Sequence, residues 1–422
     1  MLIEFSVKNF RSFRDEVIFS MEAGNGDELP NNVFEVNNTK ILKTASLYGA
    51  NASGKSNFMR AFTAAIMMVR NSNMIPLGAR WAEIVPFLLD ECSRNEPTVF
   101  TFVFIANGVK YRYCFGTDGE KIQEESLDAY YSQKPSNIFK RTNVNDYKFI
   151  TEDNSRLKAL VARNTDNKLF LATATNWNYD KTKDAFLWFM NSIDTYDSFD
   201  MIADEDLVSY SKDDSPFKDF SLKLLRETDI LIKDIHVDYA EKDMDTNMMD
   251  LLVPPAIKNN GNSKFRSLNI EVEHEIELDN GNKKTYTLNF GDESSGTKIL
   301  FALAPSLMRA FAKTRVLIVD ELEKSLHPSL VEYIIKIFNN PNINKANSQL
   351  IFTTHAVSLL DLDLLRRDQI WFAEKNPMNG VTDLYPLDDF SVRKDENIQK
   401  GYINGRYGAI PFIGNGIDLW RE

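Results

Sequence analysis

The chain of 422 residues is 43% hydrophobic and 12% aromatic, which is ample for globular folding, and it is longer than one hydrophobic core usually allows. We therefore expect two lobes, or a main domain with a large insertion. The 49 basic and 61 acidic side chains give a net charge of −12, which argues against a broadly cationic surface, so a nucleic acid would have to bind a local patch.

Two segments of alternating polarity open the chain. Apolar and polar residues alternate over 3–13 and again over 16–24, so we expect two strands that pair with each other. Asn9, Arg11 and Ser12 lie where the first strand should end. They could contact a bound nucleotide or form a solvated turn, and the pattern leaves both interpretations open.

Residues 47–57, LYGANASGKSN, contain the phosphate-loop pattern GxxxxGK[ST]. An apolar segment over 42–49 predicts a strand before this loop. Apolar residues at three- and four-residue spacing over 57–70 predict a helix after it. The sequence therefore predicts the strand, glycine loop and helix that this motif requires.

The residue types in this loop suit a bound triphosphate. Gly49 and Gly54 let the backbone turn its N–H groups toward an anion, and the helix that follows adds the positive end of its dipole. Lys55 would reach the β- and γ-phosphates, and the Ser56 hydroxyl would ligate Mg²⁺. The alternative is a glycine turn that matches the pattern by chance.

An antiparallel part is expected next. Two aromatic-rich strands flank Asn107-Gly108 within 97–116, which predicts a hairpin, and residues 119–132 predict another strand. Antiparallel strands beside a nucleotide-binding unit favour a mixed sheet. We expect the aromatic residues of these strands to lie in the core.

The pattern is weaker over 136–285, which we interpret as an inserted, partly helical lobe. Residues 184–193 and 215–235 predict helices. The polar, proline-interrupted stretch 239–264 predicts a mobile loop, and the alternation over 268–278 predicts a strand.

A second group of small and hydroxyl residues precedes a predicted helix. Ser294, Ser295, Gly296 and Thr297 come directly before the amphipathic stretch that ends at about residue 311. Hydroxyls and a glycine at a helix start suit a phosphate, although alone they would more often form a helix cap.

Two adjacent carboxylates follow a predicted buried strand. Val316 to Val319 are apolar, and Asp320 and Glu321 come next. This arrangement matches the magnesium-and-base pair of a nucleotide hydrolase, in which Asp320 would hold the Mg²⁺ and Glu321 would polarise the attacking water. The alternative is an acidic helix start after a core strand.

The same pattern recurs once more. Residues 350–353 predict a strand, His355 lies just past its end, and 369–376 predict a further strand. At the carboxyl edge of a sheet, beside the other motifs, His355 is interpreted as a contact to the γ-phosphate.

Other sequence features exclude several classes of protein. Cys92 and Cys114 are the two cysteines, and they lack CxxC spacing, so neither a disulfide framework nor a thiolate zinc site is indicated. The N-terminus has charges where a signal sequence needs an apolar core, and no run approaches ~18 apolar residues. We expect a soluble, cytoplasmic protein with no membrane partner.

In the order phosphate loop, Ser/Gly signature, carboxylate pair and His, the chain resembles the ABC-type ATPase superfamily. It is most similar to the standalone SMC/RecF-like heads among the AAA-family ATP-binding proteins of bacteria. The segments IEFSVKNFRSF, GANASGKSN, ESSGT, VDELEKSLHP, TTHA and NGRYGAIPF carry the resemblance. Residues 1–60 and 290–375 match closely.

The resemblance implies an α/β fold, a P-loop NTPase of the ABC-ATPase head type with a mixed sheet, an antiparallel subdomain and an inserted, partly helical lobe. We expect an N-terminal ATPase lobe over 1–135 and the insertion over 136–285. A C-terminal ATPase lobe with the signature, Walker B and His motifs would span 286–375, and a tail over 376–422 would pack on the core.

The resemblance also implies a split site that uses ATP and Mg²⁺. In one subunit Lys55, Glu321 and His355 would be catalytic, with Ser56 and Asp320 at the metal. The signature of a second subunit would close over the γ-phosphate, so that ATP joins a homodimer or higher oligomer and hydrolysis opens it. Ser325 and Leu326 match a loop that crosses the dimer interface in relatives. The cofactor-binding residues would be Gly49, Asn51, Ser53, Gly54, Lys55, Ser56, Asn57, Ser294, Ser295 and Gly296.

The chain departs from the family pattern at two points. Relatives use a glutamine to sense the Mg²⁺ site, but residues 57–122 contain none, and neither Gln123 nor Gln133 can be assigned to that role. The signature has ESSGT where transporters have LSGGQ, so transport is not supported.

The sequence leaves two hypotheses for the function of the protein. The preferred hypothesis is an ATPase of phage defence or abortive infection that regulates a separately encoded effector, as many standalone members of the family do. The alternative is a DNA-binding ATPase in repair or remodelling, for which Arg393, Lys394, Lys400 and Arg406, interleaved with Tyr402 and Tyr407, could form a patch. The same tail could instead pack along the sheet edge through Ile398, Ile403, Ile410 and Phe412. A fused nuclease domain is rejected, because only about 45 residues follow the last strand.

Overall fold

The chain forms two compact units in the computed structural model. Residues 1–149, 153–196, 204–212, 214–228, 230–243, 264–393 and 396–411 are described. Unit 1 comprises Met1–Ser198, Ala310–Lys324 and Val331–Glu422, and unit 2 comprises Phe199–Arg309 and Ser325–Leu330. The second unit begins near residue 199, which differs from the predicted start of an insertion at 136.

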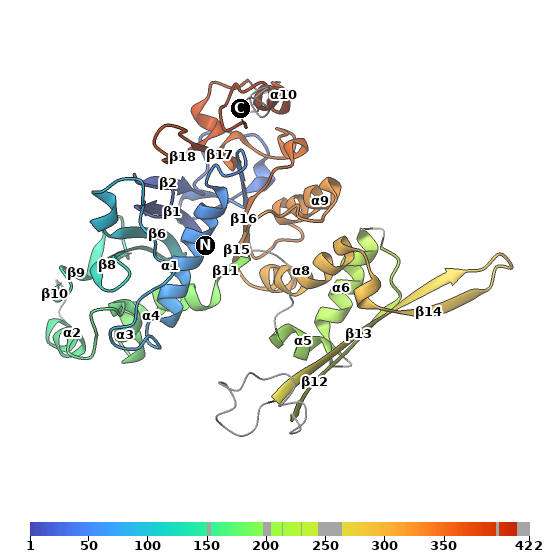
Figure 1. The fold of residues 1–422 in the computed structure, drawn as a ribbon, viewed down its shortest axis with the longest axis horizontal. Helices are drawn as coiled ribbons and strands as arrows, with labels where there is room; N and C mark the ends of the chain where they lie inside the picture. Colours follow the sequence, from blue (N-terminus) through green and yellow to red (C-terminus); the bar gives the residue numbers. More distant parts are fainter. Residues whose placement is uncertain are drawn as a thin grey trace, which may run out of the picture. The chain divides into compact units, whose positions relative to one another are not determined.

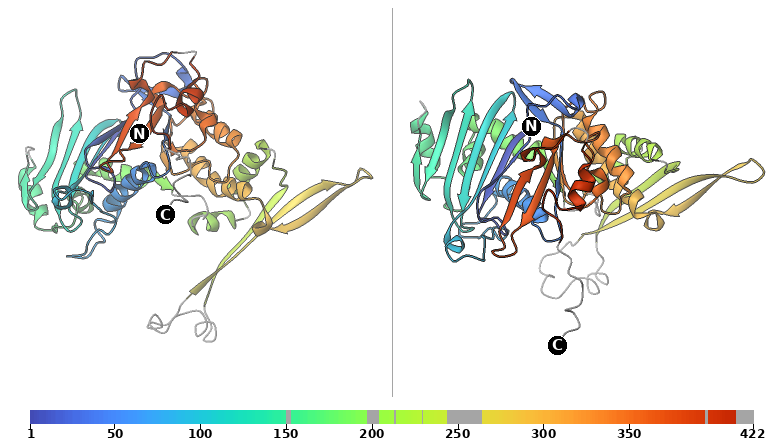
Figure 2. Two further views of the ribbon diagram at one scale, coloured as in Figure 1. Left: turned by 45° about the horizontal axis from the view of Figure 1, so that its top comes forward. Right: turned by 90° about the horizontal axis from the view of Figure 1, so that it is seen from above.

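Seven strands of the described residues in unit 1 form an antiparallel sheet, whose teal and cyan members lie side by side in Figure 2. In order across the sheet they are β10 (Asp146–Lys148), β9 (Ser136–Thr142), β8 (Ile122–Tyr130), β7 (Val109–Thr117), β6 (Thr98–Ala106), β1 (Leu2–Lys8) and β2 (Val17–Ser20). The expected pairing of the first two strands is confirmed, with Phe5 opposite Phe19. The expected hairpin is also confirmed, since Asn107 (φ 48°) and Gly108 (φ 77°) join β6 to β7 in the left-handed conformations that a tight turn needs.

Six described strands form a second sheet in unit 1, parallel except at one edge. Their order is β11 (Ile193–Tyr196), β15 (Val316–Val319), β16 (Gln349–Thr353), β5 (Thr44–Tyr48), β17 (Ile370–Lys375) and β18 (Thr382–Pro386), and only β18 runs antiparallel to its neighbour. The strands β5, β15 and β16 are buried along their whole length, which explains their continuous apolar runs. The expected α/β fold is therefore confirmed.

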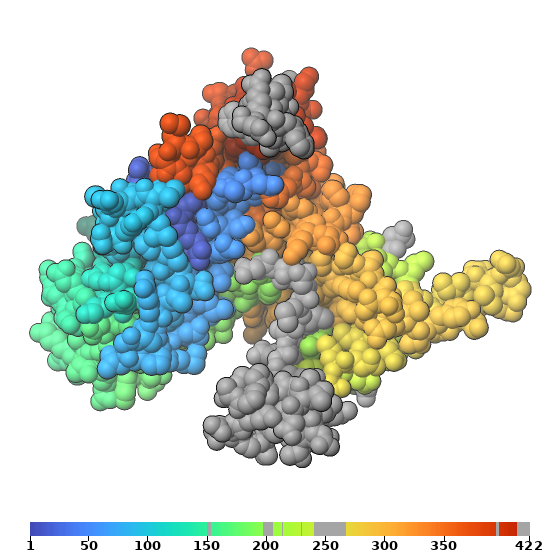
Figure 3. Space-filling model, viewed as in Figure 1, coloured from blue at the N-terminus to red at the C-terminus, as the bar shows by residue number. Residues whose placement is uncertain are grey.

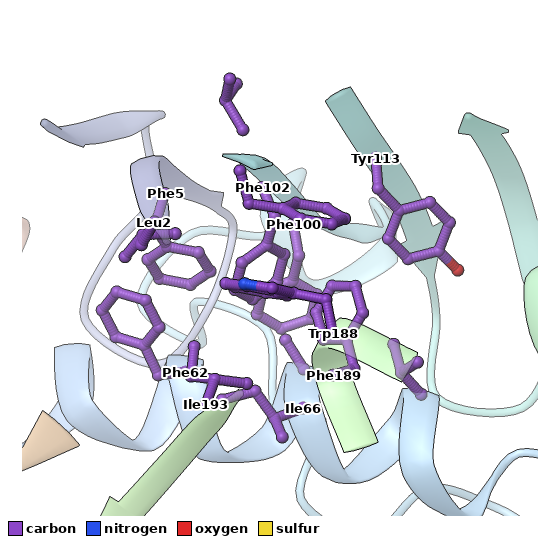
Figure 4. Close-up of a cluster of buried hydrophobic side chains, with 14 of the residues drawn as sticks. Leu2, Phe5, Phe62, Ile66, Phe100, Phe102, Tyr113, Trp188, Phe189 and Ile193 are labelled. Atoms are coloured by element: carbon purple, nitrogen blue, oxygen red, sulfur yellow. The ribbon is translucent and has the colours of Figure 1, made fainter. Parts of the chain in front are cut away.

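Helix α1 (Lys55–Asn71) follows β5 and packs its aromatic side chains on the antiparallel sheet. The rings of Phe62 and Phe5 stack with centroids 3.8 Å apart, and Phe58 meets Phe5 edge-on at 5.7 Å. Figure 4 shows Phe62 and Ile66 of α1 pointing toward Phe5 and the aromatic side chains of β6. The three- and four-residue spacing seen in the sequence therefore marks the buried face of this helix.

Unit 1 has further described helices, of which the first three contribute side chains to this core. They are α2 (Asn154–Val161), α3 (Phe170–Asn176), α4 (Asp180–Asn191), most of α9 (Pro328–Asn339) and α10 (Ile398–Ile403), and a small ribbon of β3 (Val33–Val36) and β4 (Thr39–Leu42) lies in the same unit. Trp188 of α4 stacks on Phe104 of β6 with ring centroids 4.2 Å apart (Figure 4 labels Trp188). The predicted helix over 184–193 is thus confirmed in the form of α4.

Unit 2 contains a three-stranded antiparallel ribbon and the helices that pack on it, labelled in Figure 1. Its elements are α5 (Asp204–Tyr210), α6 (Pro216–Glu227), β12 (Asp234–Asp243), β13 (Lys264–Glu277), β14 (Lys283–Asn289) and most of α8 (Ser295–Ala312). The ring of Tyr210 stacks on Phe301 with centroids 4.4 Å apart, and its hydroxyl donates to the Phe301 carbonyl at 3.1 Å.

Two sequence predictions in this region need comment. The single helix expected over 215–235 was too long, because α6 ends at Glu227 and Asp234 already begins β12. The strand expected over 268–278 is confirmed as the greater part of β13. Most of the loop expected over 239–264 lies outside the described residues.

Candidate nucleotide-binding site

The phosphate-binding loop connects β5 to α1, as the sequence predicts. Gly54 has φ 115°, a conformation that L side chains rarely adopt, and an added Cβ would lie 2.5 Å from Thr382 Oγ1. An added Cβ at Gly49 would lie 2.4 Å from the carbonyl oxygen of Ala373. Both glycines are therefore required by the close packing of the loop against β17 and the start of β18.

Lys55 begins α1 and is buried, with its ammonium group turned back onto the loop. Its Nζ donates to the carbonyl oxygens of Gly49 at 2.7 Å and Ala50 at 3.1 Å. Burial lowers the pKa of Lys55 from 10.5 to about 8, although the nearby carboxylates of Asp320, Glu321 and Glu323 oppose this shift. The loop thus holds a cation under the influence of the predicted carboxylate pair.

The carboxylate pair lies at the end of β15 and is fixed by the neighbouring strand. Thr353, the last residue of β16, donates its hydroxyl to Asp320 Oδ1 at 2.6 Å, and the same hydroxyl accepts the N–H of Glu321 at 2.7 Å. Glu321 has φ 52°, a left-handed conformation that costs a non-glycine residue roughly 1–2 kcal/mol. Such strain is concentrated at functional sites.

His355 lies beside this pair. Its Nε2 is 3.9 Å from Glu321 Oε1. The side chains of His355 and Glu321 are 39% and 46% exposed. The backbone N–H of His355 donates to Glu323 Oε1, while Glu323 Oε2 is a buried atom with no hydrogen-bond partner. Glu323 was not singled out from the sequence, although its place two residues after Glu321 was a usable signal.

The register of the parallel sheet explains why these residues meet. Thr353 pairs with Leu47 across β16 and β5, and Val319 pairs with Phe352 across β15 and β16. The phosphate loop, the carboxylate pair and His355 therefore follow the carboxyl ends of three adjacent parallel strands. Ligands of open α/β sheets bind at this edge.

The turn after β1 supports the phosphate loop from a distance in sequence. The amide of Asn57 donates to Ser12 Oγ at 3.0 Å, and the N–H of Thr382 donates to the carbonyl of Ser12 at 2.7 Å. Asn9 is fully buried, and its amide donates to the carbonyls of Ser93 and Glu96, both at 2.8 Å. The turn is therefore packed against the rest of unit 1, which argues against its interpretation as a solvated turn.

Further residues in and around the loop can be placed. Ser53 is buried, and its hydroxyl has no hydrogen-bond partner. Asn51 is exposed at the tip of the loop, and Ala52 beside it has φ 62°. Thr382, which had no sequence signal, donates its hydroxyl to the carbonyl of Ser53 at 2.9 Å and so fixes the loop from β18.

The predicted signature residues belong to unit 2. Ser294 caps α8, because its Oγ accepts the N–H of Thr297 at 3.1 Å, and an added Cβ at Gly296 would lie 3.4 Å from the carbonyl of Ser325. Ser294 and Ser295 are exposed. The structure thus brings Lys55, the carboxylate pair and His355 together in unit 1, and the signature stands in the other unit.

The donors predicted for a metal are Ser56 in the first turn of α1 and Asp320 after β15. Among the described residues, no group of three or more His, Cys, Asp or Glu side chains could hold a metal ion by itself. A hydroxyl and a carboxylate fit Mg²⁺, which keeps several waters and uses substrate phosphates instead of an all-protein cage.

The C-terminal tail packs on the sheet edge. Tyr402 and Tyr407 are buried and stack on Phe372 of β17, with centroids 5.6 and 6.0 Å away. Ile398 is buried but Ile403 is 60% exposed, while Lys394 and Phe412 lie outside the described residues. The two tyrosines are therefore not available to the basic patch that the DNA-binding hypothesis needs.

The two glutamines considered as Mg²⁺ sensors lie in or beside the antiparallel sheet of unit 1. Gln123 of β8 donates to Asp118 Oδ2 at 2.6 Å, within the turn that precedes its own strand. Gln133 lies in the turn between β8 and β9.

None of the helices in the described residues is long and apolar enough to span a bilayer.

Three comparisons with known proteins bear on the family to which the chain belongs. No curated protein matches the chain. Among solved structures, the SMC head domain from Thermotoga maritima is similar, with 15% sequence identity, a TM-score of 0.37 and coverage of 91% of this chain and 98% of that chain. Residues 45–361, which include the phosphate loop, the signature, the carboxylate pair and His355, match a protein family. The chain therefore belongs to this family, described as "AAA domain, putative AbiEii toxin, Type IV TA system".

Proposed function

We propose that the protein is an ATPase that converts ATP and water to ADP and phosphate, dimerises on MgATP and regulates a separate effector in antiviral defence. The observation that supports this most is the convergence of Lys55, Asp320, Glu321 and His355 at the carboxyl ends of β5, β15 and β16.

Each of these residues has a role that its surroundings suit. The first N–H groups of α1 and the Lys55 ammonium bind the β- and γ-phosphates, and the phosphates replace the loop carbonyls that Lys55 now contacts. Glu321 orients and polarises the attacking water, and His355 beside it contacts the γ-phosphate. Ser56 and Asp320 would hold Mg²⁺, which would supply positive charge beside the phosphates.

The second half of the site comes from another copy of the chain. Ser294, Ser295 and Gly296 stand at the N-terminal end of α8, a helix of 18 residues whose dipole favours an anion. The two serines are exposed, so a γ-phosphate bound to a second subunit can reach them. Hydrolysis removes the anion that holds the two subunits together, and the dimer opens.

Three observations favour a defence role over DNA repair. The first is the description of the family, "AAA domain, putative AbiEii toxin, Type IV TA system", which supports a link to abortive infection. The chain has a net charge of −12, and the tail tyrosines that could stack on bases are buried. A toxin-like or nuclease-like reading frame beside the gene would support the defence role.

The substitution Glu321→Gln tests the catalytic assignment. The variant should bind ATP but hydrolyse it about 10²–10⁴ times more slowly, because the general base is lost, and it should accumulate an ATP-bound dimer. Turnover of radiolabelled ATP and light scattering after size exclusion measure these two effects. Glu332→Gln, on the exposed side of α9, is the matched control and should behave like the unmodified protein.

Unchanged turnover in Glu321→Gln would show that Glu321 is not the general base.

The DNA-binding alternative has its own test. If the protein binds duplex DNA, its affinity should fall steeply and linearly with the logarithm of salt concentration. Tight binding with that salt dependence would contradict the preference for defence.

A further inference from the structure

A cleft of about 1450 Å³ opens beside the phosphate loop in unit 1. Loop residues 50–53 form one wall, and the connection between β17 and β18 over 376–381 forms another. The third wall is the tail segment 409–411. In Figure 3 the orange-red of the β17–β18 connection lies next to the blue of the N-terminal segments. A segment near the end of the chain thus lines the same hollow as the phosphate loop.

The tail is held in this position by specific hydrogen bonds. The N–H of Ala409 donates to Glu374 Oε1 at 3.1 Å, and its carbonyl accepts the hydroxyl of Tyr402 at 3.0 Å. The hydroxyl of Tyr385 donates to the carbonyl of Tyr407 at 2.9 Å. Since both polar groups of the Ala409 backbone are satisfied by side chains, the segment is fixed against β17 and β18 rather than left in solvent.

The backbone conformation of the tail is equally specific. Gly408 has φ 68°, and an added Cβ would lie 2.6 Å from the Tyr385 hydroxyl and 2.7 Å from Glu374 Oε2. Ala409 has φ 55°, which is unfavourable for a residue with a Cβ. A conformation of this cost persists only where the surroundings determine it. The tail therefore enters the cleft by a defined path.

The charges of the cleft select the kind of ligand. The lining has an excess of negative charge, which disfavours phosphate groups: its carboxylates are those of Asp15, Glu16, Asp90, Glu374 and Asp383, and its cations are Arg14 and Lys375. The carboxylates accept hydrogen bonds, however, and the hydroxyl and amino groups of a nucleoside donate them. A nucleotide with its phosphates on the loop would place its uncharged end in this cleft.

We propose that residues 409–411 form one wall of a nucleoside subsite, so that the tail is part of the nucleotide site. The ligand class is the base and ribose of a nucleoside triphosphate, and Ile410 supplies the apolar contact. This inference rests on the proposed phosphate site at Lys55, and the experiment below separates the two.

The substitution Ile410→Asp tests the subsite by placing a charge in its wall. ADP affinity, measured by isothermal titration calorimetry, should fall at least tenfold, because the nucleoside loses an apolar contact and meets an additional carboxylate. The affinity for inorganic tripolyphosphate should not change, because this probe needs only the phosphate loop. Ile403→Asp introduces the same charge on an exposed position of the same tail and should alter neither affinity.

Two results would overturn the proposal: an unchanged ADP affinity in Ile410→Asp, or an equal loss for both probes. Lys55→Ala tests the phosphate site itself. If this variant bound tripolyphosphate as well as the unmodified protein does, the phosphate site would be refuted.

Photolabelling of the unmodified chain with 8-azido-ATP does not depend on the folding of any variant. Label on residues 409–411 supports the subsite, and label found only elsewhere refutes it.

Discussion

Thr353 links the two predicted carboxylates to the neighbouring strand. Its hydroxyl donates to Asp320 and accepts from the backbone of Glu321, so one side chain uses both its donor and an acceptor on adjacent residues. Glu321 also has a left-handed backbone. The Thr353 hydroxyl thus helps to hold Glu321 in that conformation and orients the Asp320 carboxylate.

We therefore expect Thr353→Val to reduce Mg²⁺-dependent ATP hydrolysis by about 10- to 100-fold, the usual effect of losing a residue that orients a metal ligand. The Mg²⁺ concentration for half-maximal activity should rise, and ADP affinity without Mg²⁺ should stay the same. A Mg²⁺ titration of the hydrolysis rate measures this.

Thr353→Ser is the matched control for this prediction. It keeps the hydroxyl and removes only a methyl group, so it should retain most of the activity. If Val and Ser at this position had equal effects on the Mg²⁺ dependence, the hydroxyl would not be the group that positions Asp320.

At the scale of elements, a buried ion pair joins two strands to a helix in unit 1. Glu125 of β8 accepts the N–H groups of Phe170 at 2.6 Å and Leu171 at 2.9 Å, at the start of α3. Arg141 of β9 lies 3.9 Å from Glu125, and both side chains are fully buried. Burial raises the pKa of Glu125, and the Arg141 charge opposes that shift.

Arg141→Met should lower the free energy of unfolding by about 3–5 kcal/mol, because it leaves the Glu125 carboxylate buried without its partner. Chemical denaturation with urea measures the change. The exposed pair of Lys121 and Asp166 offers a control, and Lys121→Met should cost no more than about 1 kcal/mol. Equal losses in the two variants would contradict this account of the buried pair.

Local patterns predicted the elements whose partners lie nearby in the chain. The hairpin of β6 and β7 and the strand, loop and helix around Lys55 follow from periodicity and turn residues alone. Residues 136–196 belong to unit 1, where β9 pairs with β8 and β11 pairs with β15, about 120 residues later, and the second of these pairings leaves no local pattern in the sequence. Thr382 was missed for a similar reason, since its contact to the loop at Ser53 is tertiary.

At the scale of the whole molecule, the division of the predicted residues between two units bears on the mechanism. Lys55, Asp320, Glu321 and His355 lie in unit 1, and the signature residues Ser294 to Gly296 lie in unit 2. A site completed by a second copy predicts that different inactive subunits can restore each other.

We expect Lys55→Ala and Ser295→Arg to be inactive alone and to regain activity when mixed. A mixed dimer has one site with both halves intact, so an equimolar mixture should reach about a quarter of the wild-type rate. The ATP hydrolysis rate of the mixture measures this. Lys55→Ala mixed with Glu321→Gln should stay inactive, because both changes affect the same half, and a mixture of Lys55→Ala with Ser295→Arg that stays inactive would argue against a shared site.

The central position of β5 has a consequence for biosynthesis. This strand leaves the ribosome early, but its neighbours β16 and β17 are made much later, and Gln369 bonds to Thr44 across 325 positions of the chain. The antiparallel sheet, whose strands all lie before residue 149, can assemble first. The apolar strand β5 therefore stays unpaired during most of translation. A chain truncated before residue 349 should depend on chaperones and tend to aggregate.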